Sequence, residues 1–386
     1  MSSARLLPNL VLTAVALLLV TACASSEEHD GRYSSLLRLV PDQPAFRDGV
    51  TIVDYEAIRA LPGYEASRAL GMTDEELAAD PLTIRKALGW HGVGIPFRDL
   101  LGFSLDDDLS VALPNLEMGF GFGLGDVDRA LTAGVIPPRT LHIVAGDGIG
   151  SGAPDQLERC RECLPAETFE HAGREYLSWG EGQTLRIRVS PPAYDWLGRG
   201  GNFVFDGDYI VRSNFIEELE ASIDAEQGRS SLLRDEDFAL LAETIDELDV
   251  VAVFVSQKTI GPAQAAEIIS SFRASDARAP FAAEWDLPDE ATRLLPYQAF
   301  AGGVGVSDDE PFTVMVLVHS SQADAEANVD RFADRLQSGG PDESTRYADL
   351  FTSTDISSQG RVLVATLRGA GRLQAAFLGE PLLLHE

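Results

Sequence analysis

The chain has 386 residues and carries 61 acidic against 30 basic side chains, which leaves a formal net charge of −31. Phosphates need a basic surface, so this balance argues against nucleic acid as a partner and against docking on anionic lipid through a basic patch. The length exceeds that of a typical single domain, and the sequence therefore predicts one large or two medium domains.

The first 22 residues have the pattern of a secretory signal. Arg5 precedes an apolar run from Leu10 to Val20, and small residues close the run. The exit Val20-Thr21-Ala22-Cys23 resembles the lipobox of bacterial lipoproteins. The resemblance implies that Cys23 becomes the first mature residue and is acylated, and two or three acyl chains anchor a protein stably in a membrane.

An uncleaved transmembrane anchor is the alternative. A membrane span needs about 20 apolar residues, whereas Pro8 and Asn9 interrupt the candidate on one side and polar residues 25–28 close it on the other. Both interpretations predict an exported domain that lies outside the cytoplasm. Residues 1–22 are then the signal, and residues 23–45 are a lipidated tether with a short helix.

Hydrophobic periodicity and turn residues predict the elements of the mature chain. In its first half they are, in chain order, a helical turn at 34–40, a strand at 51–54, helices within 55–101, a strand at 116–122, a helix at 126–132 ended by Gly134, a strand at 140–145, a helix at 155–164, strands at 176–179 and 185–189, and a hairpin at 202–213 that turns at Asp206-Gly207. In its second half they are helices at 216–225 and 235–247, a strand at 250–255, a helix at 262–273, a strand at 312–319, a helix at 323–336, and a hairpin formed by 351–357 and 361–367.

These elements predict an α+β fold in which helices pack on antiparallel sheets. A loose polar stretch at 274–280 favours two subdomains, which we place at 46–257 and 258–386. The order of strand, helix and strand pair occurs at 140–212 and again at 312–367. This recurrence predicts a duplicated β-α-β-β unit, although the residues of the two stretches do not match.

Several short stretches resemble a group of uncharacterised bacterial lipoproteins and membrane-anchored proteins. They are SSLLRLVPD after the tether, GLGDVDRALTAG ahead of TLHIVAGD, and QGRVLVATL in the closing hairpin. The resemblance extends over most of the mature chain. It implies an exported α+β domain with no assigned activity, and it supplies no catalytic residue.

Cys160 and Cys163 are spaced i and i+3, which places both sulfur atoms on one face of a helix. In an oxidising compartment an even pair favours a disulfide. A redox pair would need a thiolate whose pKa is lowered, usually at a helix N-terminus, and the flanking Glu158 and Glu162 raise a thiol pKa instead. Two free thiols or a zinc site would also fit this spacing, and zinc would need two further ligands.

No other motif has the spacing that a known chemistry requires. The alternating glycines of 119–125 match neither nucleotide-binding fingerprint, and Asp106-Asp107-Asp108 lacks the loop pattern of an EF-hand. His142 and His171 are lone candidates for zinc ligands and are predicted to be ordinary core or capping histidines. The sequence therefore predicts no cofactor, no metal site and no catalytic residue.

The sequence favours a non-catalytic envelope lipoprotein. The lipid on Cys23 would hold it on a membrane, where it would bind an envelope protein, a glycan or a small ligand, or organise the envelope. A second hypothesis is an exported hydrolase whose site is assembled from distant residues, which a pocket with converging polar groups would favour. A third is a thiol-redox lipoprotein that uses Cys160 and Cys163, which a reducible pair with an oxidising potential would favour.

Overall fold

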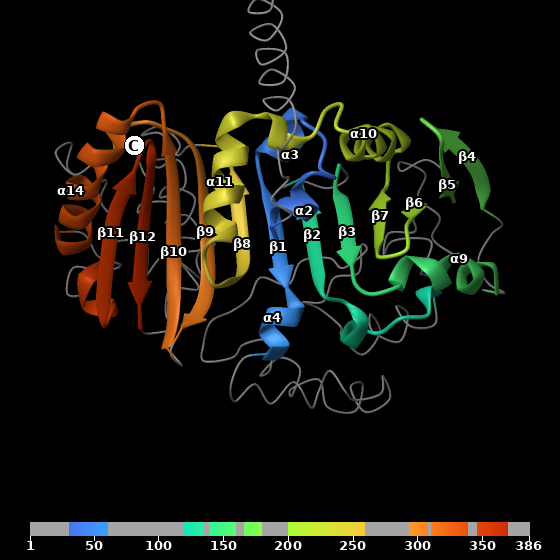
Figure 1. Ribbon diagram of the computed structural model, residues 1–386, viewed down its shortest axis with the longest axis horizontal. Coiled ribbons are helices and arrows are strands. Elements are labelled where there is room, and N and C mark those ends of the chain that lie inside the picture. Colours follow the sequence, from blue (N-terminus) through green and yellow to red (C-terminus); the bar gives the residue numbers. More distant parts are fainter. Residues whose placement is uncertain are drawn as a thin grey trace, which may run out of the picture.

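The computed structural model describes residues 31–60, 119–134, 139–159, 166–179, 200–258, 293–307, 310–338 and 346–369. Its main helices are α2 (Ser34–Leu37), α3 (Pro44–Arg47), α4 (Tyr55–Ala60), α9 (Ile149–Arg159), α10 (Ile216–Glu226), α11 (Glu236–Asp246) and α14 (Gln322–Ser338). Its strands are β1 (Val50–Asp54), β2 (Arg129–Ala133), β3 (Leu141–Ala145), β4 (Glu167–His171), β5 (Arg174–Ser178), β6 (Asn202–Phe205), β7 (Tyr209–Ser213), β8 (Val250–Ser256), β9 (Tyr297–Ser307), β10 (Glu310–His319), β11 (Ser353–Gln359) and β12 (Val362–Arg368). These elements confirm the predicted α+β class (Figure 1). The described residues do not include Cys23, Cys160 and Cys163, nor the elements predicted at 185–189 and 262–273.

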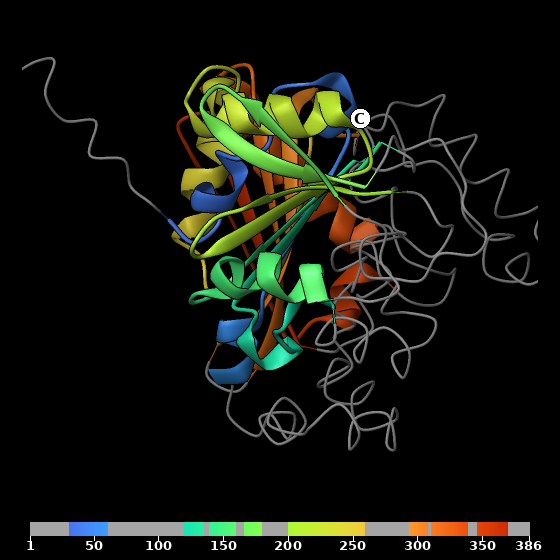
Figure 2. The same ribbon diagram turned by 90° about the vertical axis from the view of Figure 1, so that its right-hand side faces the viewer.

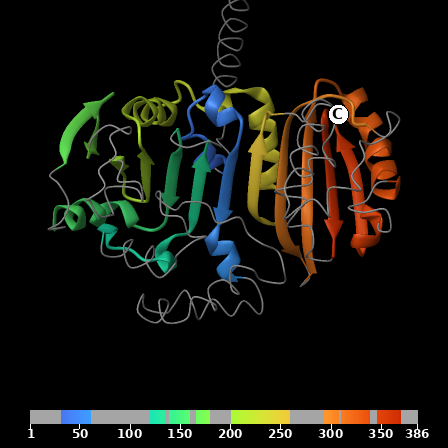
Figure 3. The same ribbon diagram turned by 180° about the vertical axis from the view of Figure 1, so that it is seen from behind.

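The described strands form one antiparallel sheet of twelve strands, in the order β11-β12-β10-β9-β8-β1-β2-β3-β7-β6-β5-β4. Figure 3 shows the same sheet from behind. The predicted subdomains 46–257 and 258–386 both contribute strands, and the pairing of β8 with β9 joins their contributions. The division into two subdomains stays a prediction.

The strand order outward from the central pair, β1 and β8, is alike in the two halves of the sheet. On one side the order is β8, β9, β10, β12 and β11, and on the other it is β1, β2, β3, β7 and β6. A helix follows the third strand in each half, α14 after β10 and α9 after β3, and the hairpin β4–β5 extends the second half alone. This order is compatible with a duplicated unit, which also stays a prediction.

The sheet is covered on both faces, as strand β10 illustrates. Val314 and Val316 point to the face that carries α2, α10 and α11, which we call the first face. Met315 and Leu317 point to the second face, where α14 packs (Figure 2). A strand that is buried on both faces has a continuous apolar sequence. This continuous run is the signal that predicts β10 as a core strand.

The helix predicted at 126–132 is wrong, because most of this segment belongs to strand β2. β2 lies between β1 and β3, and Leu131 pairs with Ile52 on one side and Ile143 on the other. Alanine, leucine and arginine favour a helix by intrinsic propensity. The hydrogen bonds and apolar contacts on both sides of the strand override that preference.

The strand predicted at 116–122 is also wrong for its described residues, 119–122. Gly119 and Phe120 are helical, and Gly121 turns the chain with a φ of +79°. Phe120 is buried, with its ring centroid 5.6 Å from that of Phe203 on β6. The glycine-rich stretch is therefore a packed turn, and no strand starts there.

Two strands, the short helix α3 and part of a second helix were not predicted. Strand β9 contains AFAGGVGVS, whose glycines are uncommon in strands, and the exposed strand β4 lacks an apolar alternation. Helix α9 begins at Ile149, five residues before Pro154, although proline normally marks the first turn of a helix. The structure confirms the other described predictions to within a few residues at their ends. These are the elements at 34–40, 51–54, 140–145, 202–213, 216–225, 235–247, 250–255, 312–319, 323–336 and the closing hairpin.

Candidate functional site

Among the described residues, a groove on the first face lies between α2 and α11 and is a candidate site. Helix α11 begins where the Asp235 carboxylate accepts hydrogen bonds from the N–H groups of Asp237 (3.0 Å) and Phe238 (3.3 Å), a typical N-cap. Glu236 and Asp237 place negative charge in its first turn, which suits the helix dipole. Buried Leu241 on the opposite side of α11 fixes the helix on the core.

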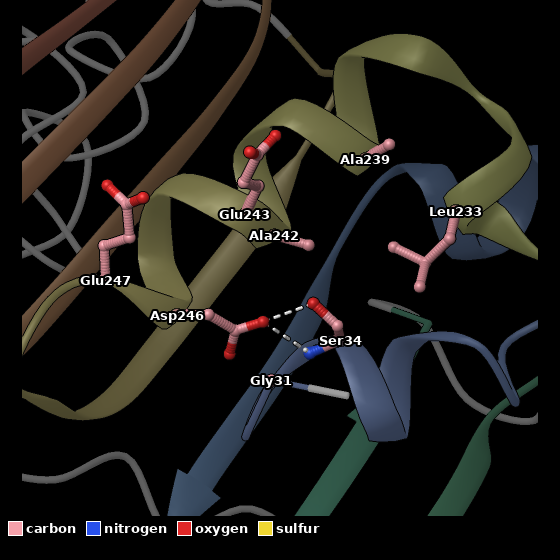
Figure 4. A pocket seen from close by; sticks show the side chains of 8 residues that line it. All are labelled: Gly31, Ser34, Leu233, Ala239, Ala242, Glu243, Asp246 and Glu247. Atoms are coloured by element: carbon pink, nitrogen blue, oxygen red, sulfur yellow. Dashed lines mark hydrogen bonds between the residues drawn. The ribbon is translucent and has the colours of Figure 1, made fainter. Parts of the chain in front are cut away.

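Asp246, at the end of α11, fastens α2 to α11 (Figure 4). Its Oδ1 accepts a hydrogen bond from the Tyr33 N–H (2.7 Å), and its Oδ2 accepts one from the Ser34 N–H (3.3 Å) and another from the Ser34 hydroxyl. The same carboxylate lies against Gly31, where an added Cβ would overlap it. A side chain at this position would push the Asp246 carboxylate away from its hydrogen bonds with Tyr33 and Ser34.

The groove has a volume of about 600 Å³. Its lining consists of Gly31, Ser34, Leu233, Ala239, Ala242, Glu243, Asp246 and Glu247. Glu243 and Glu247 stand one turn apart on the exposed side of α11, whereas Asp246 is occupied in holding α2. The arrangement can accept hydrogen bonds from a positively charged group, and it repels an anion.

Tyr33, next to the groove-lining Ser34, connects this part of the chain with the centre of the sheet. The buried hydroxyl of Tyr33 donates a hydrogen bond of 2.5 Å to the carbonyl oxygen of Val250, at the start of β8. Burial raises the pKa of Tyr33 well above its usual value, so the hydroxyl keeps its proton. Arg32 pairs with the buried Asp54 at the end of β1, with 3.4 Å between the charged atoms.

Ser213 and Glu218 form the described arrangement nearest to a nucleophile and base, as the hydrolase hypothesis would need. The Ser213 hydroxyl donates to Glu218 Oε2 (2.8 Å) and accepts from the Phe215 N–H (3.1 Å), at the start of α10. Burial raises the pKa of Glu218, and Arg139 lies 3.3 Å from its Oε1. The hydroxyl thus connects the N–H of Phe215, which precedes α10, with a carboxylate in the first turn of that helix, which is a structural role.

His142 is a core histidine, as the sequence predicts. Its Nδ1 lies 3.3 Å from Thr132 Oγ1 and its Nε2 lies 3.1 Å from Thr140 Oγ1. The register of the sheet places Thr51, Thr132, His142 and Arg212 side by side on β1, β2, β3 and β7. Threonine hydroxyls at both ring nitrogens explain how the imidazole is accommodated in the core.

His319, at the end of β10, is fully buried. The Asn328 amide on α14 donates to its Nε2 (2.7 Å), and the same amide group exchanges hydrogen bonds with the backbone of Leu295. These bonds fix the amide so that an N–H faces the ring, and a protonated ring would set N–H against N–H. Burial lowers the pKa of His319 from its ordinary value of 6.5.

We therefore expect acidification to destabilise the fold through His319. The unfolded chain binds a proton more readily than the folded chain, so this contribution is complete above pH 6.5 and declines as the pH falls below it. The measurement is the denaturant midpoint between pH 5 and pH 8. His319→Gln keeps an acceptor for Asn328 without a titratable ring, and its midpoint should change less with pH. Equal pH dependence in both proteins would contradict this assignment.

The predicted cysteine pair lies outside the described residues, but the helix ahead of it is described. Helix α9 runs from Ile149 to Arg159, so three turns precede Cys160 in the chain, where the sequence suggested about one. A reactive thiol is favoured at the N-terminus of a helix, where the helix dipole lowers its pKa. The length of α9 ahead of Cys160 therefore gives no support to the redox hypothesis.

Among the described residues, no helix is long and apolar enough to cross a membrane. The described part of the chain likewise contains no group of three or more histidine, cysteine, aspartate or glutamate side chains placed to hold a metal ion. His171, the second lone histidine considered as a zinc ligand, ends β4 and faces carboxylates of α10.

Comparisons with known proteins assign no family to the chain. No protein-family model matches it, and no curated protein matches it. Among solved structures, crystal form III of TP0453 is similar at 7% identity with a TM-score of 0.36, covering 88% of this chain and 96% of that one. Crystal form I of TP0453 is similar at 7% identity with a TM-score of 0.34, covering 89% and 96%. Values this low support no inference about function.

Proposed function

We propose that the protein is an exported lipoprotein of the cell envelope with a non-catalytic binding role. The observation that carries the proposal is the fixed position of Gly31 against Asp246, in the groove between α2 and α11. Seven residues separate Gly31 from Cys23, the predicted site of acylation. At about 3.5 Å per residue, such a tether reaches about 28 Å from the lipid to the folded domain.

A short tether gives the groove a defined place. If Cys23 carries the lipid, the groove lies at the membrane-proximal end of the folded chain, within reach of ligands at the surface of the membrane. Glu243 and Glu247 at its rim favour a ligand with a positive charge, either a small molecule or a basic segment of an envelope protein. We therefore propose the groove as the binding surface.

Cys23→Ala tests the anchor. The variant should appear in the soluble fraction or keep its signal uncleaved, whereas the wild-type protein should be found in the membrane fraction with an acylated N-terminal cysteine, as measured by fractionation and intact-mass spectrometry. Ser25→Ala, two residues further on, is the matched control and should behave as wild type. A Cys23→Ala protein that is normally cleaved and still membrane-bound would disprove lipidation at this residue.

Native mass spectrometry of protein extracted from its own envelope tests the binding role. A retained ligand should add mass to the wild-type protein, and the double variant Glu243→Gln, Glu247→Gln should lose it while its thermal stability is unchanged. Both side chains are exposed, so their replacement is expected to alter the free energy of unfolding by less than about 0.5 kcal/mol. Equal retained mass in both proteins would place the binding surface elsewhere.

A further inference from the structure

The hairpin formed by β4 and β5 is only partly joined to the sheet. Its two strands pair along their whole length, but β5 pairs with β6 only through Leu177 and Ser178. The other end of β5, from Arg174 to Tyr176, has no ladder partner among the described residues of β6. The attachment of this end therefore depends on side chains.

His171 supplies the central contact between the hairpin and α10. Its Nε2 lies 3.3 Å from Asp224 Oδ1 and its Nδ1 lies 3.8 Å from Glu220 Oε2. The two carboxylates come from successive turns of α10, and the imidazole side chain is 29% exposed. A proton on the ring would create an ion pair with each carboxylate, whereas a neutral ring has at most a hydrogen bond to offer.

The other charged groups around His171 make the cluster negative. Arg174 stands directly opposite His171 on β5 and pairs with Asp206 (2.6 Å) and Glu226 (3.6 Å). Arg229 pairs with Asp224 at 2.8 Å. The described residues thus set two guanidinium groups against four carboxylates, from Asp206, Glu220, Asp224 and Glu226. A third positive charge on His171 reduces the excess of negative charge in the cluster.

Two further hydrogen bonds and an aromatic stack complete the attachment. The Tyr176 hydroxyl donates to Glu220 Oε1 (2.9 Å), and burial together with that carboxylate raises the pKa of Tyr176 to about 12, so the donor persists over the physiological range. The Gln227 amide donates to the carbonyl oxygen of Ala172 (2.9 Å) in the hairpin turn. Phe169 stacks on Tyr176 with 5.5 Å between ring centroids. Beneath this stack lies one end of the core on the first face.

We propose that the β4–β5 hairpin is a latch on α10, which protonation of His171 closes and deprotonation loosens. The proposal depends on the bridging position of His171 between two carboxylates and on the short ladder between β5 and β6. Histidine changes charge between about pH 5 and pH 8 in most settings, so a mild change of pH would work the latch. Loosening uncovers the ring of Tyr176, which is 3% exposed in the closed hairpin, beside the already exposed Phe169.

Hydrogen exchange of the full chain at pH 5.5 and pH 8.0, corrected for the intrinsic rate, tests the latch. The peptide covering 167–178 should be about two- to fivefold better protected at pH 5.5, as expected for ion pairs with partly exposed partners. A peptide from β10 provides the internal reference for global stability. His171→Gln should lower protection of the hairpin at pH 5.5 and abolish its dependence on pH.

Two further variants separate the latch from a general effect of charge. Asp224→Asn removes a partner of His171 and should weaken the pH dependence of the hairpin, whereas Glu243→Gln removes an equal charge on α11 and should leave it intact. The proposal is wrong if the wild-type hairpin shows no change with pH, or if His171→Gln retains the wild-type change. These outcomes are independent of the lipid anchor and of ligand binding in the groove.

Discussion

Replacing Phe332 with alanine should lower the free energy of unfolding by about 3–5 kcal/mol. Phe332 is fully buried on α14 and packs in the core of the second face, with Met315 and Leu317 of β10 and Leu363 of β12 among its cluster. Removing the ring loses the free energy gained by burying it away from water, and it leaves a cavity that the rigid sheet cannot fill. Denaturant titration, followed by circular dichroism, measures the loss.

Two companion variants make the Phe332 result specific. Asp330→Ala lies on the exposed side of the same helix and should change stability by less than about 0.5 kcal/mol. Phe332→Leu keeps most of the apolar volume and should lose less than the alanine variant. A loss below about 1 kcal/mol for Phe332→Ala would mean that α14 does not contribute to the cooperative core.

Gly150→Ala should destabilise the fold by about 1–3 kcal/mol or more. A Cβ at Gly150, in the first turn of α9, would overlap the carbonyl oxygen of Asp206 and lie 2.8 Å from that of Tyr209. Both obstacles are backbone atoms of the β6–β7 turn, so no side chain can rotate away. The helix would have to move off the hairpin, and the hydrogen bond from the Gly150 N–H to Gly207 (3.2 Å) would be strained.

Gly152→Ala is the matched control, because the same helix carries both glycines. A Cβ at Gly152 meets nothing within 4 Å, and the residue is exposed. Alanine is favoured over glycine within a helix by about 0.5–1 kcal/mol. Thermal unfolding should therefore separate the two variants in opposite directions, and a shared direction would contradict the close contact between α9 and the β6–β7 turn.

Local sequence patterns predicted the elements whose residues by themselves favour one type of secondary structure. The apolar runs on either side of the Asp206-Gly207 turn predicted the β6–β7 hairpin, and the spacing of Ala325, Phe332 and Leu336 predicted α14. Strand β2 was mistaken for a helix because its side chains favour a helix in isolation and only the neighbouring strands decide otherwise. Strand β9 was missed because its glycines fit between neighbours that the sequence does not show to be close.

The candidate site could not be predicted, because its residues are brought together only by the fold. Asp246 lies more than 200 positions from Tyr33 and Ser34 in the chain, and no local pattern connects them. The contacts of His171 with Glu220 and Asp224 likewise join a strand to a distant helix. An acidic composition indicates abundant carboxylates, and it does not reveal which of them are neighbours.

The fastening of α2 at the centre of the sheet has a mechanical consequence for an anchored protein. If Cys23 is anchored, a pull on it would arrive at Gly31 and load the ion pair of Arg32 with Asp54 and the hydrogen bond from the Tyr33 N–H to Asp246 before those of Ser34. Peeling α2 from α11 would also break the hydrogen bond from the Tyr33 hydroxyl to Val250, at the start of β8. Strand β1 would separate later than α2, since β2 and β8 pair with it on both sides. The contacts that hold α2 would therefore break before the pairing of β1 within the sheet.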